Sequence, residues 1–387
     1  MSFSLLQVYK DYYPPVVGGI ERHVHSLANA LQGRCRVRVL VANRNRRTEH
    51  EVVDGVPVTR VADLGRFLSA PVSPAFPYWL KRLDSDLVHF HLPNPTAEIS
   101  ALLSRPRGKV VATYHSDIVR QKLTGALYAP ALRAFLRRAD ALIVTSPIYA
   151  RTSPVLGEIA ERCRVIPLGV DPKPYEQTAE MDERVAELLG RTPGPRIYFL
   201  GVLRYYKGLP YLVRAMRDLS AHLYIGGDGP VRPELERLVR ATGLADRVHF
   251  LGALAERDAI AWMHACDVFC LPAHLRSEAF GLCQVEAHLC GKPVVSTRLD
   301  TGVPFVNQHE VTGLVVPPRS PEALAEALAR LLADGDLRAR LGAKARARAL
   351  EEFTLETMIG RLWRVYLELL DGRPGQCRVP ETPCQSG

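Results

Sequence analysis

The feature that most constrains the fold is a corner between a buried strand and a helix in the second half of the chain. Residues 267–272 form an apolar run that ends at a proline, which predicts a buried strand. The residues after the corner are typical of a helix, with Gly291 as its cap, and another strand begins near Val294. In an open parallel α/β sheet, such corners hold the ligand. Residues 274–287 are therefore the first candidate for a functional site.

Two carboxylates, Glu278 and Glu286, flank Gly281 within this corner. Glu278 precedes the helix and Glu286 lies about two turns into it. If both residues were helical, their side chains would point in directions roughly 80° apart around the helix axis, so different roles are expected. Gly281 leaves the free amides of the first turn bare, so that an anion or a sugar hydroxyl can approach the positive helix end. Carboxylates accept hydrogen bonds from sugar hydroxyls and stabilise developing positive charge. The alternative is that Glu278 caps the helix and Glu286 lies on its solvated face.

The length of 387 residues predicts two domains rather than a single core. A hydrophobic content of 47% is that of a soluble globular protein, and no run reaches the roughly 18 apolar residues that cross a bilayer. The N-terminus does not resemble an export signal, so a cytoplasmic protein is expected. The eight cysteines lack metal-binding spacing, which favours free buried thiols.

The positive charge is confined to the first half of the chain. Residues 1–171 contain 23 Lys and Arg against 14 Asp and Glu, a net charge of +9, whereas residues 172–387 contain 27 of each. No nucleic-acid motif is present, so an anionic membrane surface is favoured over nucleic acid as a partner. Residues 120–138 mix apolar and basic side chains. They either lie in a membrane interface or pack as a surface helix on their own sheet, and the two are compatible.

Strands alternate with helices in both halves, which predicts doubly wound α/β sheets. Gly18 and Gly19 lie between the first strand and a helix, so that the backbone can approach a bulky ligand with helix amides behind it. His115 ends a later strand, where it can donate to a sugar hydroxyl or position a phosphate, although a structural histidine is the alternative. His91 is a weaker candidate. Residues 84–86 spell Asp-Ser-Asp ahead of a buried strand, which favours a turn and cap, and no metal is assigned.

Two cations follow the strand at 196–201. Arg204 has a planar guanidinium that can donate two parallel hydrogen bonds to phosphate oxygens. Lys207, ahead of the next helix, has a flexible side chain that carries a single positive charge. A glycine turn at 226–230 follows another strand. Arg232 stands where the last glycine of G-x-G-x-x-G would be, so a dinucleotide-dependent dehydrogenase is disfavoured.

Taken in order, these motifs resemble the retaining glycosyltransferases of family 4, which have the GT-B fold. The resemblance covers about residues 4–370. One departure concerns the arginine that the family places directly after a glycine. Val202 stands there in this chain, so we assign the role of that arginine to Arg204. The matching motifs are the glycine loop at 18–19, Val165–Asp171, Lys207-Gly208, the turn at 226–230 and the E-x7-E pattern from Glu278 to Glu286.

The resemblance implies an α/β chain with two Rossmann-like, doubly wound domains facing a cleft. Residues 1–171 would bind the acceptor and residues 172–353 the nucleotide sugar. A helix at 354–371 would cross back to the first domain, and residues 372–387 would be a disordered tail.

The resemblance also implies roles for single residues. Lys207 and Arg204 would stabilise the departing diphosphate, Glu278 would bind sugar hydroxyls, and His115 would contact a hydroxyl of the transferred sugar. Further contacts to the nucleotide sugar are expected from Gly18, Gly19, Gly227, Leu251, Phe280, Gly281, Leu282 and Glu286, the last to the ribose.

The activity implied is a retaining transfer with a nucleotide-diphosphate sugar as co-substrate, no other cofactor and no metal. Residues 114–121, 203–208 and 301–304 are similar to bacterial mannosyl- and rhamnosyltransferases of surface-polysaccharide biosynthesis (lipopolysaccharide O-antigen or exopolysaccharide). A GDP-linked mannose or rhamnose donor and a glycan or lipid-linked acceptor are therefore predicted, at the inner face of the cell membrane. The alternatives are a GT-B-fold nucleotide-sugar isomerase of the 2-epimerase type and a catalytically silent nucleotide-sugar-binding protein.

Overall fold

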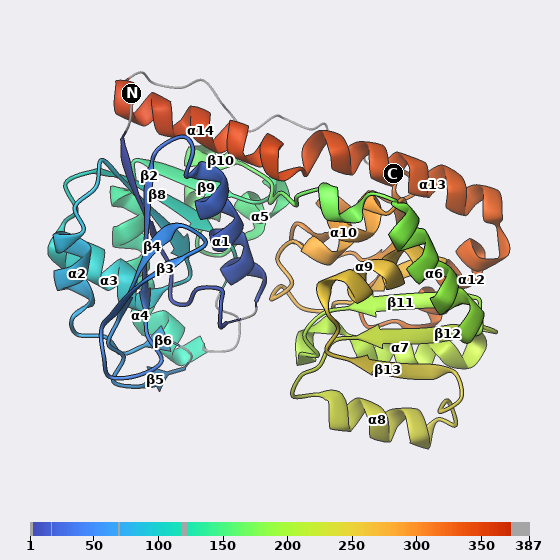
Figure 1. The fold of residues 1–387 in the computed structure, drawn as a ribbon. Helices are drawn as coiled ribbons and strands as arrows, with labels where there is room; N and C mark the ends of the chain where they lie inside the picture. Colours follow the sequence, from blue (N-terminus) through green and yellow to red (C-terminus); the bar gives the residue numbers. More distant parts are fainter. Residues whose placement is uncertain (1–2, 17, 69, 118–121, 373–387) are drawn as a thin grey trace. The chain divides into compact units, whose positions relative to one another are not determined.

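The computed structural model describes residues 3–16, 18–68, 70–117 and 122–372, with the side chains of residues 122–127 left aside. The chain divides into two compact units (Figure 1). Unit 1 holds the chain up to Pro167 together with the segment from Met358 onward, and unit 2 holds Leu168–Thr357. Residues 373–387, where a disordered tail is predicted, lie outside the described residues, as do Arg120 and Gln121 of the predicted basic helix.

Unit 1 is built on a sheet of strand order β10-β9-β8-β7-β1-β2-β4-β3. All neighbours pair in parallel except β3, which runs antiparallel to β4 at one edge. Helices cover both faces of such a sheet, so its inner strands are buried throughout, as β7 is at all six residues. The strands are β1 Ser4–Val8, β2 Arg36–Ala42, β3 Glu49–Val53, β4 Val56–Val61, β7 Leu87–Leu92, β8 Lys109–Tyr114, β9 Ala141–Val144 and β10 Cys163–Val165.

The helices of unit 1 begin and end at recognisable signals. Asn94 caps α3, where its side chain accepts a hydrogen bond from the Ala97 amide.

The final helix packs on this unit, since Trp363 stacks on Phe3 and Tyr366 hydrogen-bonds to His89 at 2.6 Å. The helices are α1 Gly19–Leu31, α2 Phe76–Arg82, α3 Pro95–Ser104, α4 Lys122–Arg138, α5 Pro147–Thr152, η1 Gly157–Arg162 and α14 Leu355–Asp371, and a small hairpin joins β5 Arg66–Phe67 to β6 Ala70–Pro71.

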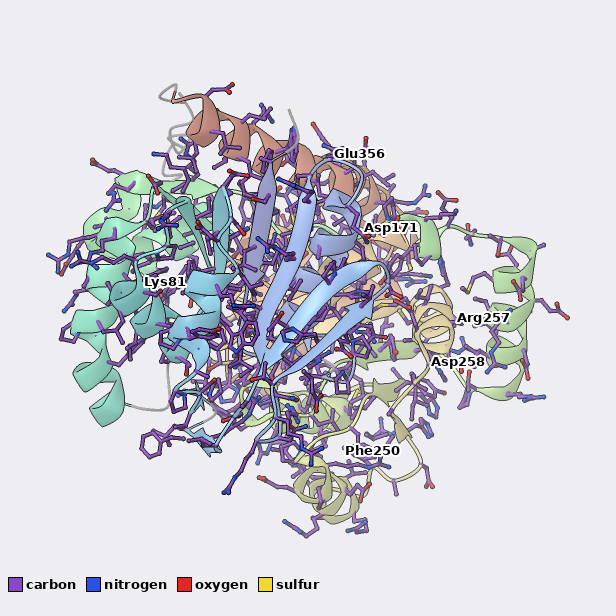
Figure 2. All side chains as sticks on the ribbon, turned by 60° about the vertical axis from the view of Figure 1, so that its left-hand side comes forward. Lys81, Asp171, Phe250, Arg257, Asp258 and Glu356 are labelled. Carbon is purple, nitrogen blue, oxygen red and sulfur yellow. The ribbon has the colours of Figure 1, made fainter. Side chains whose placement is uncertain are left out.

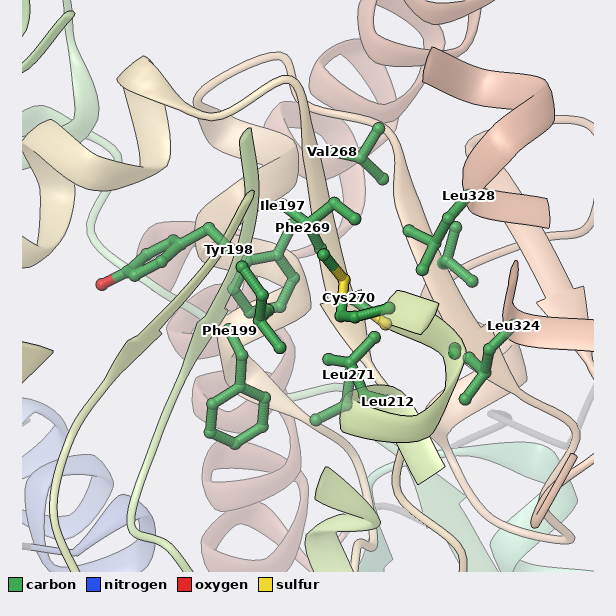
Figure 3. Close-up of a cluster of buried hydrophobic side chains, with 14 of the residues drawn as sticks. Ile197, Tyr198, Phe199, Leu212, Val268, Phe269, Cys270, Leu271, Leu324 and Leu328 are labelled. Carbon is green, nitrogen blue, oxygen red and sulfur yellow. The ribbon is translucent and has the colours of Figure 1, made fainter. Parts of the chain in front are cut away.

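Unit 2 is built on a six-stranded, wholly parallel sheet of order β13-β12-β11-β14-β15-β16. Figure 3 shows its core, where side chains of β11 and β14 meet those of α7 and α12. Ile197, Phe199, Phe269 and Leu212 are all fully buried there. The strands are β11 Arg196–Leu200, β12 His222–Gly226, β13 Val248–Gly252, β14 Val268–Leu271, β15 Val294–Thr297 and β16 Gly313–Val316.

The helices of unit 2 bury one face and expose charges on the other. On α9, Arg257 and Asp258 project from the surface (Figure 2), and Asp258 accepts a hydrogen bond from Arg184 of α6 at 2.9 Å. The helices are η2 Lys173–Tyr175, α6 Ala179–Arg191, η3 Tyr205–Lys207, α7 Leu209–Ala215, η4 Met216–Asp218, α8 Arg232–Ala241, α9 Glu256–Ala265, α10 Leu282–Leu289, α11 Val303–Val306, α12 Pro321–Ala333 and α13 Gly335–Glu352.

Each sheet reverses its strand order at one point. In unit 1 the chain moves outward from β1 on one side and returns on the other side at β7. In unit 2 the corresponding neighbours are β11 and β14. Ligands of open α/β sheets bind beyond the carboxyl ends of the strands at such a switch point. The predicted doubly wound α/β class is confirmed, and the loops after β1, β7, β8, β11 and β14 are where a site is expected.

Two further expectations can be compared with the described residues. Within them, no helix is long and apolar enough to cross a membrane. The six cysteines that the structure describes are free thiols, and four of them are buried. Burial raises the pKa of the Cys35 and Cys163 thiols to about 11, so these side chains stay protonated and behave as apolar groups.

Candidate active site

A buried ion pair lies at the switch point of unit 2. Lys207 ends η3 in the loop after β11, and Glu278 lies in the loop after β14. Lys207 Nζ is 2.6 Å from Glu278 Oε2, and both residues are more than nine-tenths buried. Burial is the largest single effect and would lower the pKa of Lys207, but Glu278, Cys283 and Tyr206 together outweigh it, so the pKa is raised. The site therefore holds a permanent ammonium group, fixed in position by a carboxylate.

The backbone brings these two loops into contact. Gly208, with φ of +72°, follows Lys207 directly, and a Cβ there would clash with the carbonyl oxygen of Pro272. The His274 amide donates to the Tyr206 carbonyl at 3.0 Å, which ties the same two loops together. The loop after β11 consequently rests on the end of β14, and Lys207 reaches Glu278 because these strands are neighbours.

The glycine corner that opened the sequence argument forms the bare start of α10. Gly281 has a φ of +75°, and a Cβ there would lie 2.7 Å from Leu271 Cδ2. No side chain caps the helix at this residue. Glu278 is paired with Lys207 instead, so the alternative in which Glu278 caps the helix is wrong.

The other residues of the corner differ in what they present. Phe280 is 3% exposed and packs edge-on against Phe353 at 5.9 Å, so only its backbone is left to meet a ligand. Glu286 is half-buried on α10 and hydrogen-bonded to Tyr175. The alternative in which Glu286 lies on a solvated face is therefore wrong. Burial, followed by the charge of Glu286, raises the pKa of Tyr175. Leu282, the first residue of the helix, is half-buried.

Arg204 is exposed at the start of the η3 turn, and its carbonyl accepts a hydrogen bond from the Lys207 amide at 3.0 Å. Its charge acts on the nearby Tyr206. Burial and Glu278 raise the pKa of Tyr206, and Lys207 and Arg204 both act to lower it. The charges of two cations and one carboxylate thus act on Tyr206, and Lys207 Nζ is 5.8 Å from the centre of its ring. Val202, which stands where the family has its arginine, is 40% exposed.

The glycine turn after β12 lies beside the same loop. Gly227 has a φ of +112°, and a Cβ there would clash with the Gly201 carbonyl oxygen. Its amide donates to the Gly252 carbonyl at 2.7 Å, next to the half-buried Leu251. The turn after β12 therefore packs directly on the backbone of the loop after β11 and is tied by a hydrogen bond to the end of β13.

In unit 1, histidines gather at the corresponding edge. His115 follows β8 and hydrogen-bonds to His91 of β7 across 3.0 Å, and His91 hydrogen-bonds to Gln7 of β1 at 2.7 Å. His23 from α1 completes the cluster, with its ring centre 5.3 Å from that of His115. All are buried, and His115 Nδ1 has no hydrogen-bond partner in the part of unit 1 that the structure describes. This nitrogen is therefore a candidate contact for a ligand.

Burial keeps these histidines neutral. It lowers the pKa of His23 to about 4 and lowers those of His91 and His115 well below the usual value. One ligand nitrogen of each lies within 4.8 Å of the others. Neutral imidazoles suit a transition-metal ion, so among the described residues of unit 1 this cluster is the arrangement that could hold a metal. As sugar-binding groups, neutral imidazoles can instead donate or accept a hydrogen bond.

The Asp-Ser-Asp pattern at 84–86 has a structural role. Asp86 Oδ2 accepts hydrogen bonds from the amide and the hydroxyl of Ser4, both at 2.7 Å. These bonds lower the pKa of Asp86. The residue ties the amino ends of β1 and β7 together, at the edge opposite to the histidines, as a turn and cap would.

Gly18 and Gly19 differ in the space around them. Gly18 precedes α1, and a Cβ there would clash with the end of the Glu21 side chain. Gly19 is the first residue of α1, and nothing described lies within 4 Å of a Cβ placed on it. Packing within the protein therefore does not account for a glycine at this position.

Sequence reasoning missed His23 and Gln7 and did not place His91 beside His115. One signal was available for the histidines, because residues 89 and 91 alternate by two along a strand and therefore share a face. The parallel register, with His91 opposite Thr113, then brings that face towards His115. His23 joins the cluster only through the packing of α1, which spacing along the chain does not reveal.

The chain matches known glycosyltransferases along most of its length. Residues 17–173 match the family model "Glycosyltransferase Family 4", and residues 181–348 match "Glycosyl transferases group 1". The chain is 32% identical to O-antigen chain mannosyltransferase C of Escherichia coli, over 95% of this chain and 99% of that protein. It is 36% identical to a D-rhamnosyltransferase of Pseudomonas aeruginosa, over 90% of this chain and 92% of that protein.

Solved structures show the same fold. A sucrose-phosphate synthase from Thermosynechococcus elongatus superposes with a TM-score of 0.79 at 24% identity, over 95% of this chain and 99% of that one. An Anabaena protein solved with UDP-glucose superposes with a TM-score of 0.76 at 21% identity, over 95% of this chain and 100% of that one. The predicted GT-B class is confirmed by these matches. The chain therefore belongs to glycosyltransferase family 4, and it is a hexosyltransferase.

Proposed function

We propose that the protein transfers mannose or rhamnose from a GDP-linked donor to a glycan or lipid-linked acceptor in cell-surface polysaccharide biosynthesis. Transfer retains the anomeric configuration and needs no metal. The observation that carries the proposal is the buried Lys207–Glu278 pair at the switch point of unit 2, beside the exposed Arg204. The choice of sugar is supported by two relatives, whose names are those of an O-antigen mannosyltransferase and a D-rhamnosyltransferase.

In this proposal unit 2 binds the donor. Lys207 and Arg204 stabilise the charge that develops on the diphosphate as its bond to the anomeric carbon breaks. The acceptor hydroxyl attacks the same face of that carbon and gives its proton to the departing phosphate oxygen. Lys207 is already charged and held by Glu278, so little reorganisation is needed at that moment.

Sugar and ribose hydroxyls are assigned to the two carboxylates. Glu278 accepts from hydroxyls of the transferred sugar, and Glu286 accepts from the ribose while Tyr175 holds it in place. Backbone groups at Gly227, Leu251 and the start of α10 contact the rest of the nucleotide sugar. The residues assigned at this helix start are Phe280, Gly281 and Leu282.

Unit 1 binds the acceptor in this proposal, and His115 contacts the transferred sugar. The side-chain oxygen of Gln7, Oε1, accepts a hydrogen bond from the Nε2–H of His91. The Nδ1 of His91 is then unprotonated and accepts a hydrogen bond from the Nε2–H of His115. His115 Nδ1 then carries a lone pair and accepts a hydrogen bond from a sugar hydroxyl. A neutral imidazole in one tautomer serves this role without titrating near pH 7.

The donor is tested by calorimetry against GDP-mannose, GDP-rhamnose, UDP-glucose, dTDP-rhamnose and UDP-N-acetylglucosamine, with a chelator present throughout. We expect a GDP-sugar to bind at least about tenfold more tightly than the UDP- and dTDP-sugars, as expected where a site is built for one base. Transfer in the chelator should match transfer without it.

Three results would contradict parts of this proposal. Equal affinity for all bases removes the GDP assignment. Activity lost in the chelator and restored by a metal ion points to the cluster of His23, His91 and His115 as a metal centre. Turnover of UDP-N-acetylglucosamine without an acceptor identifies an isomerase instead.

Gly19→Ala tests whether the glycine loop admits a ligand. A Cβ has open space there, and alanine favours a helix, so folding stability should be unchanged or rise by up to about 1 kcal/mol. If a substrate approaches this backbone, KM for the donor or the acceptor should rise about tenfold or more. Thermal unfolding and steady-state kinetics measure the two effects. A variant with unchanged stability and unchanged KM would remove Gly19 from the binding site.

The predicted basic helix remains a proposal for membrane contact. In its described part, Leu132, Phe135 and Leu136 are buried, while Arg133 and Arg137 are exposed. One face thus packs on unit 1, and a cationic face is free to meet an anionic membrane surface, which would place the enzyme peripherally on the inner face of the cell membrane.

A further inference from the structure

The buried histidines of unit 1 bring their ring nitrogens close together. His91 Nδ1 lies 3.0 Å from His115 Nε2, and one ring nitrogen each of His23, His91 and His115 lies within 4.8 Å of the other two. Two ligands of a tetrahedral zinc ion, each about 2.0–2.1 Å from the metal, are about 3.3 Å apart. His91 and His115 therefore already have nearly the spacing that one ion requires.

His23 can complete the set of ligands. Its ring meets those of His115 and His91 edge-on, with ring centres 5.3 and 5.6 Å apart. Among the described residues, no hydrogen bond is recorded for this ring, so a turn of the side chain would bring its nitrogen to the ion. The group contains three imidazoles and no carboxylate. Such ligands suit zinc, copper, nickel and cobalt, whereas magnesium and calcium prefer oxygen.

His91 is held in the orientation that a metal ligand needs. Its Nε2–H donates to Gln7 Oε1 at 2.7 Å, so Nδ1 carries the lone pair. Histidines that bind metals almost always donate from the second ring nitrogen to an oxygen in this way. The ring of His89 stacks on that of His91 with centres 4.4 Å apart. Both nitrogens of His89 are hydrogen-bonded in turn, to Tyr366 and Thr113.

The charge near the cluster favours a cation. Tyr9 lies edge-on to His91, with ring centres 6.4 Å apart. Burial, followed by the charges of Glu21 and Asp11, raises the pKa of Tyr9, so two carboxylates act on this part of unit 1. Neutral imidazoles do not repel an ion, and a metal held by three histidines keeps a fourth position for water or an anion.

We propose that His23, His91 and His115 bind one divalent transition-metal ion such as Zn²⁺, and that the bound ion inhibits transfer. Coordination needs a lone pair on His115 Nε2, so the proton that this nitrogen donates to His91 moves to His115 Nδ1. Nδ1 then donates where it accepted before, and a sugar hydroxyl that donates to it loses its acceptor. The inhibition rests on the proposed contact of His115 with the transferred sugar, whereas the metal site does not.

The test is equilibrium dialysis of the intact chain, without an affinity tag, against Zn²⁺, Co²⁺ or Mg²⁺. We expect Zn²⁺ and Co²⁺ to bind at the cluster and Mg²⁺ not to bind. The absorption spectrum of bound Co²⁺ should lack the charge-transfer band that thiolate ligands produce, which distinguishes the histidines from the cysteines. Transfer should be about tenfold slower with Zn²⁺ bound, and a chelator should restore it.

Two variants weaken the site in different ways. His23→Asn removes a ligand and should lower the affinity for Zn²⁺ at least about 100-fold. Gln7→Leu keeps the three ligands but removes the oxygen that orients His91, so the affinity should fall about 10–100-fold. In both variants, the Zn²⁺ concentration that inhibits the unmodified protein should hardly change the variant's own metal-free rate. Thermal unfolding without metal checks that each variant is folded, and either one suffices for the test.

His249→Asn is the matched control. His249 and His222 of unit 2 are hydrogen-bonded at 3.1 Å with ring planes 17° apart. The pair of His91 and His115 has almost the same geometry, at 3.0 Å and 17°. The unit 2 pair has no third metal-binding side chain beside it among the described residues. His249→Asn should therefore leave both the affinity for Zn²⁺ and the inhibition unchanged.

The outcomes separate this inference from the proposed function. Zn²⁺ that binds His23→Asn as tightly as the unmodified protein would overturn the metal site, whatever the donor turns out to be. Zn²⁺ binding that His249→Asn abolishes would overturn it as well, because the ion would then lie in unit 2. Zn²⁺ bound at the cluster without slower transfer would overturn the inhibition. A failed GDP-sugar assignment with Zn²⁺ binding that depends on His23 would leave the metal site standing.

Discussion

Lys207→Met is expected to lower kcat by about 10²–10³, because the ammonium that stabilises the leaving diphosphate is gone. The same change should lower the free energy of unfolding by about 3–5 kcal/mol, since it leaves the Glu278 carboxylate buried without its partner. Both residues are more than nine-tenths buried, and their charged atoms are 2.6 Å apart. Steady-state kinetics with a saturating donor and urea unfolding measure the two losses separately.

A double variant distinguishes catalysis from folding. Lys207→Met/Glu278→Gln removes both charges, so most of the lost stability should return because no unpaired charge remains. Activity should stay low, since neither the ammonium nor the carboxylate is restored. Full activity in the double variant would show that the pair is a structural element only. Glu278→Ala with intact transfer would likewise remove the carboxylate from the sugar-binding site.

The members of this pair could be found from the sequence, but the pairing could not. Glu278 was found from a strand, a glycine and a helix in succession, all of which are local signals. Lys207 was found as a cation ahead of a helix. Their contact depends on β11 lying next to β14, with two other strands intervening in the chain. Strand order in a parallel sheet is non-local, so spacing alone left open whether Glu278 caps α10 or pairs with a cation.

The same limit applies in unit 1. His115 could be placed at a strand end from the apolar run before it. The neighbours that fix its hydrogen bonds, His91 and Gln7, come from two other strands, and His23 comes from a helix. What decides the chemistry of His115 is burial by all of these elements together, and it is not visible in any stretch of the chain.

Lowering the pH from 7 to 5 is expected to destabilise unit 1 by several kcal/mol. Burial lowers the pKa of His23 to about 4 and that of His89 to about 3, and it also lowers those of His91 and His115. Unfolded histidine titrates near 6.5, so below that pH the unfolded chain binds more protons than the folded one. Stability then falls with pH, by about 2 kcal/mol at pH 5 for each such histidine.

One buried carboxyl opposes this trend. Burial raises the pKa of Glu98 to about 8, so the folded state holds a proton that the unfolded state releases above about 4.5. As the pH falls from 7 to 5, the contribution of Glu98 to the free energy of unfolding rises by roughly 2–3 kcal/mol. The four histidines together outweigh it. His23→Asn should therefore reduce the acid loss by about 2 kcal/mol, and Glu98→Gln should increase it by a similar amount.

Tryptophan fluorescence can follow unit 1 by itself. Trp79 and Trp363 lie in unit 1 and Trp262 lies in unit 2, so a Trp262→Phe background reports on unit 1 alone, the unit that contains His23, His89, His91 and His115. Urea unfolding at pH 7, 6 and 5 in that background gives the loss of stability directly. A free energy of unfolding that is the same at pH 5 as at pH 7, in both His23→Asn and its parent, would mean that these histidines protonate in the folded state. A protonated His115 could no longer accept from a sugar hydroxyl, and the neutral role assigned to it would be lost along with the acid sensitivity.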